Sequence, residues 1–234
     1  MSSYTNNIDQ NNFYFNGLIE KKINQLKCTK NLNDFIKKMD ALNLCQDINW
    51  KQSYQDTFDL NQDMIIKNDF FINFLFEQNI PQYLESITGH KLYLGDVVLR
   101  KTYLKEKSYM DWHRDTYLKN GSAVGRTPPL IKIIYYPDPK NCQSLELEII
   151  KGSHIQYFQN KFIQKFQQFF SKRIKIYSSN TKFLIFNSAI MHAAKCPKKD
   201  GAFRLIYNFC SESQLSQFEK AKLIHLKYME LITK

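Results

Sequence analysis

The sequence predicts an α+β protein in which a mainly antiparallel β-sandwich or barrel is flanked by helices. Three observations carry this prediction. Apolar residues recur at helical spacing before Gly89, short runs of branched and aromatic residues separated by turn residues follow it, and the last twenty or so residues are amphipathic. Because the strand-like runs follow one another without regular helices between them, they favour a sandwich or barrel over alternating β and α units.

The first part of the chain is predicted to be helical. Apolar spacing over residues 18–44 predicts one or two amphipathic helices. A further helical stretch is expected from about Asp63 to Ile87, with a break at Pro81, because proline lacks the N–H that a helix interior needs. Gly89 is well placed to end it, since glycine readily adopts the left-handed conformation after the last turn.

The sheet is predicted to begin after Gly89. A helix over residues 154–170 interrupts it, with phenylalanines at helical intervals, and another is expected over 213–234. The predicted strands cover 91–104, 109–115, 130–136, 145–151, 173–178, 182–187 and 203–209.

Length and composition predict one folded domain. The chain has 234 residues, of which 43% are hydrophobic and 24% charged, a balance typical of globular proteins. We expect a single domain over 1–234, with a helical N-terminal part over about 1–90, a core over about 91–211 and a C-terminal helix over about 213–234.

Cysteine usage and hydropathy predict a cytoplasmic protein. The five cysteines are widely spaced and form no zinc-knuckle or dithiol pattern, which indicates reduced thiols. The first residues lack a basic region followed by an apolar one, and no run approaches the roughly 18 apolar residues that a bilayer span needs.

The net charge of +11 raises the question of a nucleic-acid partner. It arises from 33 Lys and Arg against 22 Asp and Glu. Most of the basic residues are lysines spread along the chain, as on an ordinary solvated surface, so charge alone does not predict nucleic-acid binding, although it leaves that partner open.

A metal site is predicted from three residues. His113 and Asp115 are two positions apart in a predicted strand, so their side chains project from the same face. His192 follows 79 residues later, after another strand-like run. Two histidines and one carboxylate leave open positions on a metal, as non-haem Fe(II) oxygenases require for a 2-oxo acid and dioxygen.

Arg204 is the predicted anchor of such a 2-oxo acid. Its planar guanidinium can bind a carboxylate through two parallel hydrogen bonds. Alternation along residues 203–209 places Arg204 on one face with Ile206 and Asn208, while the other face is apolar and aromatic. One face is therefore expected to line a pocket.

These residues resemble the phytanoyl-CoA dioxygenase-like family of Fe(II)- and 2-oxoglutarate-dependent oxygenases. The resemblance covers about residues 91–211. It rests on WHRD at 112–115, LEIIKGSH at 147–154 and FLIFNSAIMHA at 183–193, with the arginine twelve residues after the distal histidine.

The resemblance implies a double-stranded β-helix, or jelly-roll, with His113, Asp115 and His192 as ligands of Fe(II). It further implies 2-oxoglutarate held by Arg204 and consumed with O2 to give succinate and CO2. Because Asp115 is retained, whereas related halogenases replace it with a small residue, hydroxylation is expected. Ala194 stands where the family often has Ser or Thr, so the resemblance assigns no second anchor for 2-oxoglutarate.

The substrate is expected to be a small metabolite. Arg126, in the segment 116–129, is available for an anionic group, and Trp112 is placed either to pack the barrel or to contact substrate. His154 is expected to pack or to cap the following helix. Two alternatives stay open, a jelly-roll binding protein without redox chemistry and an oxygenase acting on nucleic acid or protein.

Overall fold

The computed structural model describes most of the chain. Described residues run from 2 to 232, apart from residue 25 and the segments 41–46, 55–56, 104–109, 116–127, 138–144, 156–160 and 196–201.

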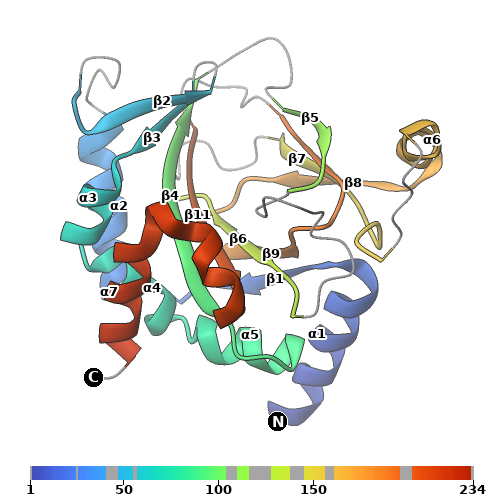
Figure 1. The fold of residues 1–234 in the computed structure, drawn as a ribbon, viewed down its shortest axis with the longest axis horizontal. Helices are drawn as coiled ribbons and strands as arrows, with labels where there is room; N and C mark the ends of the chain where they lie inside the picture. The colour runs from blue at the N-terminus through green and yellow to red at the C-terminus, as the bar shows by residue number, and fades with distance from the viewer. Residues whose placement is uncertain are drawn as a thin grey trace.

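Two antiparallel sheets face each other and confirm the predicted mainly β architecture (Figure 1). In spatial order, the larger sheet contains β1 (Leu18–Lys22), β9 (Lys182–Asn187), β6 (Ile131–Tyr135), β11 (Ala202–Cys210), β4 (Tyr93–Thr102), β3 (Thr57–Leu60) and β2 (Trp50–Tyr54). The smaller sheet contains β5 (Met110–His113), β10 (His192–Ala194), β7 (Leu145–Ile150) and β8 (Arg173–Tyr177).

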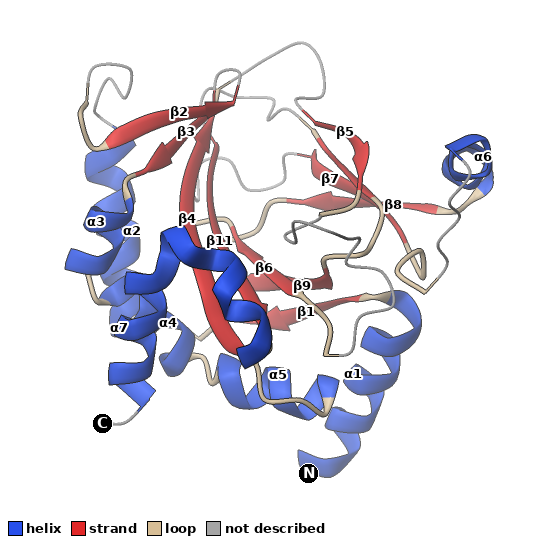
Figure 2. Cartoon of the chain, in the orientation of Figure 1, coloured by secondary structure: helices blue, strands red, loops and turns tan. Residues whose placement is uncertain are grey.

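Helices cover the outer face of the larger sheet, so that the molecule has three layers (Figure 2). Those packed near this face are α2 (Lys27–Asp40), α3 (Gln62–Lys67), α4 (Phe70–Glu77), α5 (Ile80–Thr88) and α7 (Lys222–Ile232). The other helices are α1 (Ser2–Asn16), α6 (Lys161–Phe170) and the 3-10 segment η2 (Glu212–Ala221).

Alternation along β11 separates two apolar cores. Phe203, Leu205 and Tyr207 point toward the helices and join the larger core, whereas Ile206 points between the sheets and joins a smaller one. The side chains of Phe203 and Leu205 are almost fully buried. The space between the sheets is therefore the inner side of the sandwich, and any side chain directed there meets both sheets.

The N-terminal third contains three strands that the sequence analysis did not predict. Residues 18–22 were expected in a helix, but they form β1, which pairs with β9 along the edge of the larger sheet. Gly17, with φ of 72°, ends the preceding helix α1 and lets the chain turn into β1. The adjacent apolar residues Leu18 and Ile19 also fit a strand that is buried on both faces, since Leu18 joins the smaller core and Ile19 the larger one.

The second helical stretch is broken twice, at Asn68 and Asp69, which was not predicted, and at Gln78 and Asn79, shortly before the predicted break at Pro81. α4 ends at Glu77, and α5 begins at Ile80 with Pro81 in its first turn, where a missing N–H costs no hydrogen bond. Asn79 joins the helices in a left-handed conformation, and Gly89, with φ of 70°, ends α5 as predicted.

The two later helices also differ from the prediction. The helix expected from residue 154 is seen as α6 from Lys161, and residues 156–160 lie outside the described part. The predicted C-terminal helix consists of η2 followed by α7, with non-helical angles at Phe218.

Candidate metal centre

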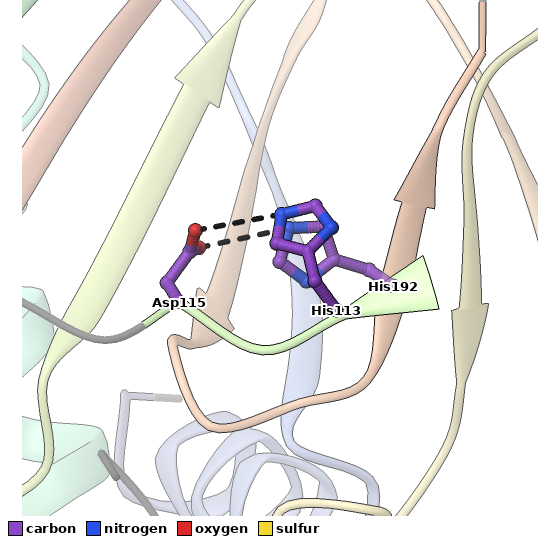
Figure 3. Close-up of side chains that lie close together, drawn as sticks. All are labelled: His113, Asp115 and His192. Carbon is purple, nitrogen blue, oxygen red and sulfur yellow. Dashed lines mark ion pairs between the residues drawn. The ribbon is translucent and has the colours of Figure 1, made fainter. Parts of the chain in front are cut away.

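His113 and His192 are brought together by pairing within the smaller sheet. β5 and β10 are antiparallel, and His113 lies directly opposite His192 in their register. The ring centroids are 4.3 Å apart. Asp115 lies two residues beyond His113, just past the end of β5, and its backbone N–H donates to the carbonyl oxygen of Ser188. Figure 3 shows the carboxylate facing both imidazoles.

The three side chains have the spacing of ligands that share one ion. The Nε2 atoms of His113 and His192 lie 3.7 and 3.6 Å from the Asp115 carboxylate oxygens, and one ligand atom from each residue lies within 4.8 Å of the others. Two ligands that bind one ion at about 2.1 Å are roughly 3 to 3.5 Å apart. The donor set, two imidazoles and a carboxylate, therefore fits a divalent transition metal.

Backbone carbonyls orient both imidazoles. His113 Nδ1 lies 2.6 Å from the carbonyl oxygen of Asp111, and His192 Nδ1 lies 3.0 Å from that of Ile190. Each Nδ1 must carry the proton in order to donate to its carbonyl, which leaves the Nε2 lone pair directed at the shared site. The tautomers that a metal requires are thus set by the carbonyl two residues before each histidine.

Lys132 on β6 extends the centre to the larger sheet. Its Nζ lies 2.6 Å from Asp115 Oδ2, and both side chains are largely buried. Burial by itself raises the pKa of the Asp115 carboxyl, but Lys132 and the two histidines outweigh it and hold that pKa below its usual value. The carboxylate is therefore ionised and available as a ligand at neutral pH.

Burial lowers the pKa of His192 to about 4, despite the nearby Asp115 carboxylate. We expect the metal-free protein to lose stability on acidification from about pH 6.5 to about pH 4. In this window the unfolded chain binds a proton at this position and the folded chain does not, so folding weakens as pH falls. Thermal unfolding in EDTA across this range measures the effect, and His192→Gln should flatten it; an equally steep profile in that variant would contradict the assignment.

Arg114 ties together the chain segments that carry the ligands. Its Nη1 donates to the carbonyl oxygen of Ser153 at 2.6 Å and also contacts the carbonyl oxygen of Ala189. Ser153 in turn accepts a hydrogen bond from the N–H of Met191 at 2.8 Å. The loop that precedes His192 is therefore fixed to the segment that links His113 and Asp115.

We expect Arg114→Met to weaken Fe(II) binding by about 10- to 100-fold, the usual effect of losing a group that orients ligands. The three ligands remain, but their segments are no longer joined. Competition titration against a metal indicator measures the affinity. Arg100→Met is the matched control, because Arg100 lies on β4, outside the segments that carry the ligands, and its guanidinium binds both oxygens of Asp59. Equal affinities in the two variants would refute a positioning role for Arg114.

Arg204 lies on the inter-sheet face of β11, as alternation predicted. Its side chain is only 2% exposed, and Nη2 donates to the carbonyl oxygen of Lys195 at 3.2 Å. Asn208 lies on the same face opposite Lys132, and its Oδ1 has no hydrogen-bond partner among the described groups. The buried Arg204 guanidinium and the buried Asn208 amide therefore face the space between the sheets, where the metal triad lies. Both can hydrogen-bond a polar ligand there.

The remaining candidates are less central. Trp112 lies on β5 between Asp111 and His113, so it projects away from the ligand face, and its ring lies under the Arg173 guanidinium at 5.2 Å. Arg126 lies outside the described residues. His154 is buried, with Nε2 2.9 Å from the carbonyl oxygen of Tyr14, which fits the expected packing role.

Sequence analysis missed three residues of the centre. Lys132 had a visible signal, because it is the only charged residue in the apolar run PPLIKIIYY at 128–136. Arg114 lies inside the predicted motif, but nothing in the sequence says which carbonyls its guanidinium reaches. Ser153 was not assigned to the centre, but its hydroxyl donates to the carbonyl oxygen of Ile150 and accepts from the N–H of Met191.

Comparison with solved structures identifies the fold class. SnoN, a non-haem alpha-ketoglutarate-dependent epimerase of nogalamycin biosynthesis, matches with a TM-score of 0.66 at 10% identity, over 89% of this chain and 84% of its own. AviO1 from Streptomyces viridochromogenes Tue57 matches with a TM-score of 0.63 at 11% identity, over 91% and 97%. EctD from S. alaskensis, solved with 2-oxoglutarate and 5-hydroxyectoine, matches with a TM-score of 0.61 at 13% identity, over 89% and 76%.

The chain therefore has the double-stranded β-helix fold of non-haem 2-oxoglutarate-dependent enzymes, as predicted. No family model and no curated protein sequence matches it. Within the described part of the chain, no helix is both long and apolar enough to span a bilayer.

Proposed function

We propose that this protein is an Fe(II)- and 2-oxoglutarate-dependent dioxygenase that hydroxylates a small metabolite and releases succinate and CO2. The observation that carries the proposal is the convergence of His113, Asp115 and His192 within 4.8 Å, on a fold shared with such enzymes. EctD has been solved with 2-oxoglutarate, and SnoN has been solved with Fe3+ and alpha ketoglutarate, which is the same compound.

In this proposal each group of the chain has one task. The two imidazole Nε2 atoms and the Asp115 carboxylate hold the metal on one side, while Lys132 keeps the carboxylate ionised. Arg204 binds the far carboxylate of 2-oxoglutarate from its buried position between the sheets. Bound Fe(II) and 2-oxoglutarate would supply, with O2, the oxidant for an unactivated C–H bond.

The test is an anaerobic titration with Fe(II) and 2-oxoglutarate, followed by measurement of succinate in air. We expect a weak visible charge-transfer band in the ternary complex and succinate formation that requires iron. His192→Ala should abolish both. A band that persists unchanged in His192→Ala would remove this residue from the site, and iron binding without succinate formation would favour a binding protein without redox chemistry.

The reaction outcome and substrate need a separate test. SnoN is described as an epimerase, so a shared fold leaves hydroxylation as one of several oxidative outcomes. We propose a small substrate, with Arg126 available for an anionic group and Trp112 at the sheet edge. Mass analysis of products from a metabolite screen distinguishes hydroxylation, which adds one oxygen atom, from epimerisation, which adds none. Salt-dependent retention on DNA or RNA would instead favour a nucleic-acid substrate.

A further inference from the structure

Helix α6 is oriented with its apolar side toward solvent. Phe162, Phe166, Phe169 and Phe170 recur at intervals that place them on one side of the helix, and their exposed fractions lie between 62% and 81%. Gln167 and Gln168, on the opposite side, are partly buried. A helix that packs on its own protein shows the reverse arrangement, with apolar residues inward.

No residue of α6 belongs to the apolar clusters formed by the described residues. The helix lies at the periphery of the molecule, beyond the end of β8 (Figure 1). Its C-terminal end is nevertheless fixed, because the Arg173 guanidinium donates to the carbonyl oxygen of Gln168 at 2.9 and 3.2 Å. The last turn of α6 is thus joined to the start of β8, and the aromatic face is exposed.

The sequence segment that contains α6 carries charge of one sign, and Glu148, just before it, lies opposite Lys175 in the pairing of β7 with β8. Residues 149–199 contain no Asp or Glu, whereas they contain ten Lys and Arg. Lys165 on α6 and Lys172 and Lys175 beyond it are exposed. An exposed aromatic face with lysines beside it and no acidic residue in the surrounding sequence has the chemistry of a helix that lies in the interface of an anionic membrane.

The length of α6 fits a protein partner less well than a membrane. Ten helical residues span about 15 Å. A stable protein interface of about 800 Å² per partner is roughly 30 Å across, so the helix alone is too small for one. Insertion into lipid needs no complementary groove, because the phenylalanine rings enter a fluid layer while the lysines remain at the headgroups.

We propose that α6 docks this protein on anionic lipid bilayers, with the four phenylalanines inserted at the interface and the neighbouring lysines at the phosphate groups. This peripheral binding is independent of the proposed oxygenase activity. It places the protein at a membrane surface.

Cosedimentation with vesicles tests the proposal, using phosphatidylcholine alone and phosphatidylcholine with about one-third phosphatidylserine. We expect the full chain to bind the anionic vesicles and to bind the neutral ones weakly. Binding should fall as NaCl rises from about 0.1 M to about 0.5 M, because salt screens the lysines. The triple variant Phe166→Ser, Phe169→Ser, Phe170→Ser should bind at least about tenfold more weakly.

Phe15→Ser is the matched control, because Phe15 on α1 is 61% exposed, close to the 62% of Phe166. It should leave vesicle binding unchanged, and circular dichroism should show all variants folded. The proposal fails if wild-type protein does not bind anionic vesicles, or if the triple variant binds as well as wild type. A third outcome also contradicts it. If the wild-type protein forms a dimer instead of binding vesicles, and the triple variant abolishes that dimer, then the aromatic face binds a second copy of the chain and not lipid.

Discussion

Asp115→Ala is expected to abolish metal binding and to destabilise the metal-free fold by about 3–5 kcal/mol. The first effect follows because two imidazoles alone bind Fe(II) weakly. The second follows because Lys132 Nζ, 2.6 Å from the carboxylate and largely buried, would lose the anion that compensates its charge. Chemical denaturation in EDTA measures stability, and Fe(II) titration measures binding.

The double variant Asp115→Ala, Lys132→Met separates these two effects. Replacing a buried ion pair by apolar groups of similar volume is often close to neutral, so most of the lost stability should return. Metal binding should not return, because the ligand is still missing. A double variant as unstable as Asp115→Ala would show that Lys132 is not the residue left uncompensated, and restored iron binding would remove Asp115 from the ligand set.

Arg204→Met is expected to raise the Kd for 2-oxoglutarate by about 100-fold or more, while Fe(II) affinity changes little. A guanidinium that is 2% exposed between the two sheets can bind a carboxylate with little competition from water. Arg204→Lys should be intermediate, because it keeps the charge and loses the planar fork. Anaerobic titration of the iron-loaded protein with 2-oxoglutarate gives the three constants.

Arg100→Met is the control for this prediction. Arg100 lies directly opposite Arg204 in the pairing of β4 with β11, but its guanidinium is bound to both oxygens of Asp59 at 2.7 and 2.8 Å. Its loss should affect stability and leave the Kd for 2-oxoglutarate near the wild-type value. If the two variants weaken 2-oxoglutarate binding equally, a general loss of positive charge explains the effect, and Arg204 is not its specific anchor.

Much of the core could be predicted from local patterns. The seven predicted strands over 91–209 each coincide with an observed strand, because alternating or branched apolar runs between turn residues are a local signal. β1, β2, β3 and β10 were missed. β1 and β3 pair with β9 and β4, which lie more than 40 residues away in the chain, and β10 is only three residues long. Strand pairing over such distances leaves little trace in the residues of one strand.

The same distinction holds at the site. The two-residue spacing of His113 and Asp115, with a distal histidine in order, was sufficient to select the three residues that lie within reach of one ion, although Asp115 lies just past the end of β5. Their partners were not predictable, because Lys132 reaches Asp115 from the opposite sheet and Arg114 binds carbonyls of two distant segments. Arg204 as the anchor of 2-oxoglutarate stays a prediction.

The sequence by itself determined the types of side chain and, for His113 and Arg204, which lie in predicted strands, the face that carries them, because both are set by residue identity and the two-residue repeat of a β-strand. Only the tertiary structure decided which groups meet. Pairing of β5 with β10 places two imidazoles side by side, and packing of one sheet on the other brings an ammonium group against the carboxylate between them. Such contacts depend on long-range register and layer packing, which no short stretch of sequence encodes.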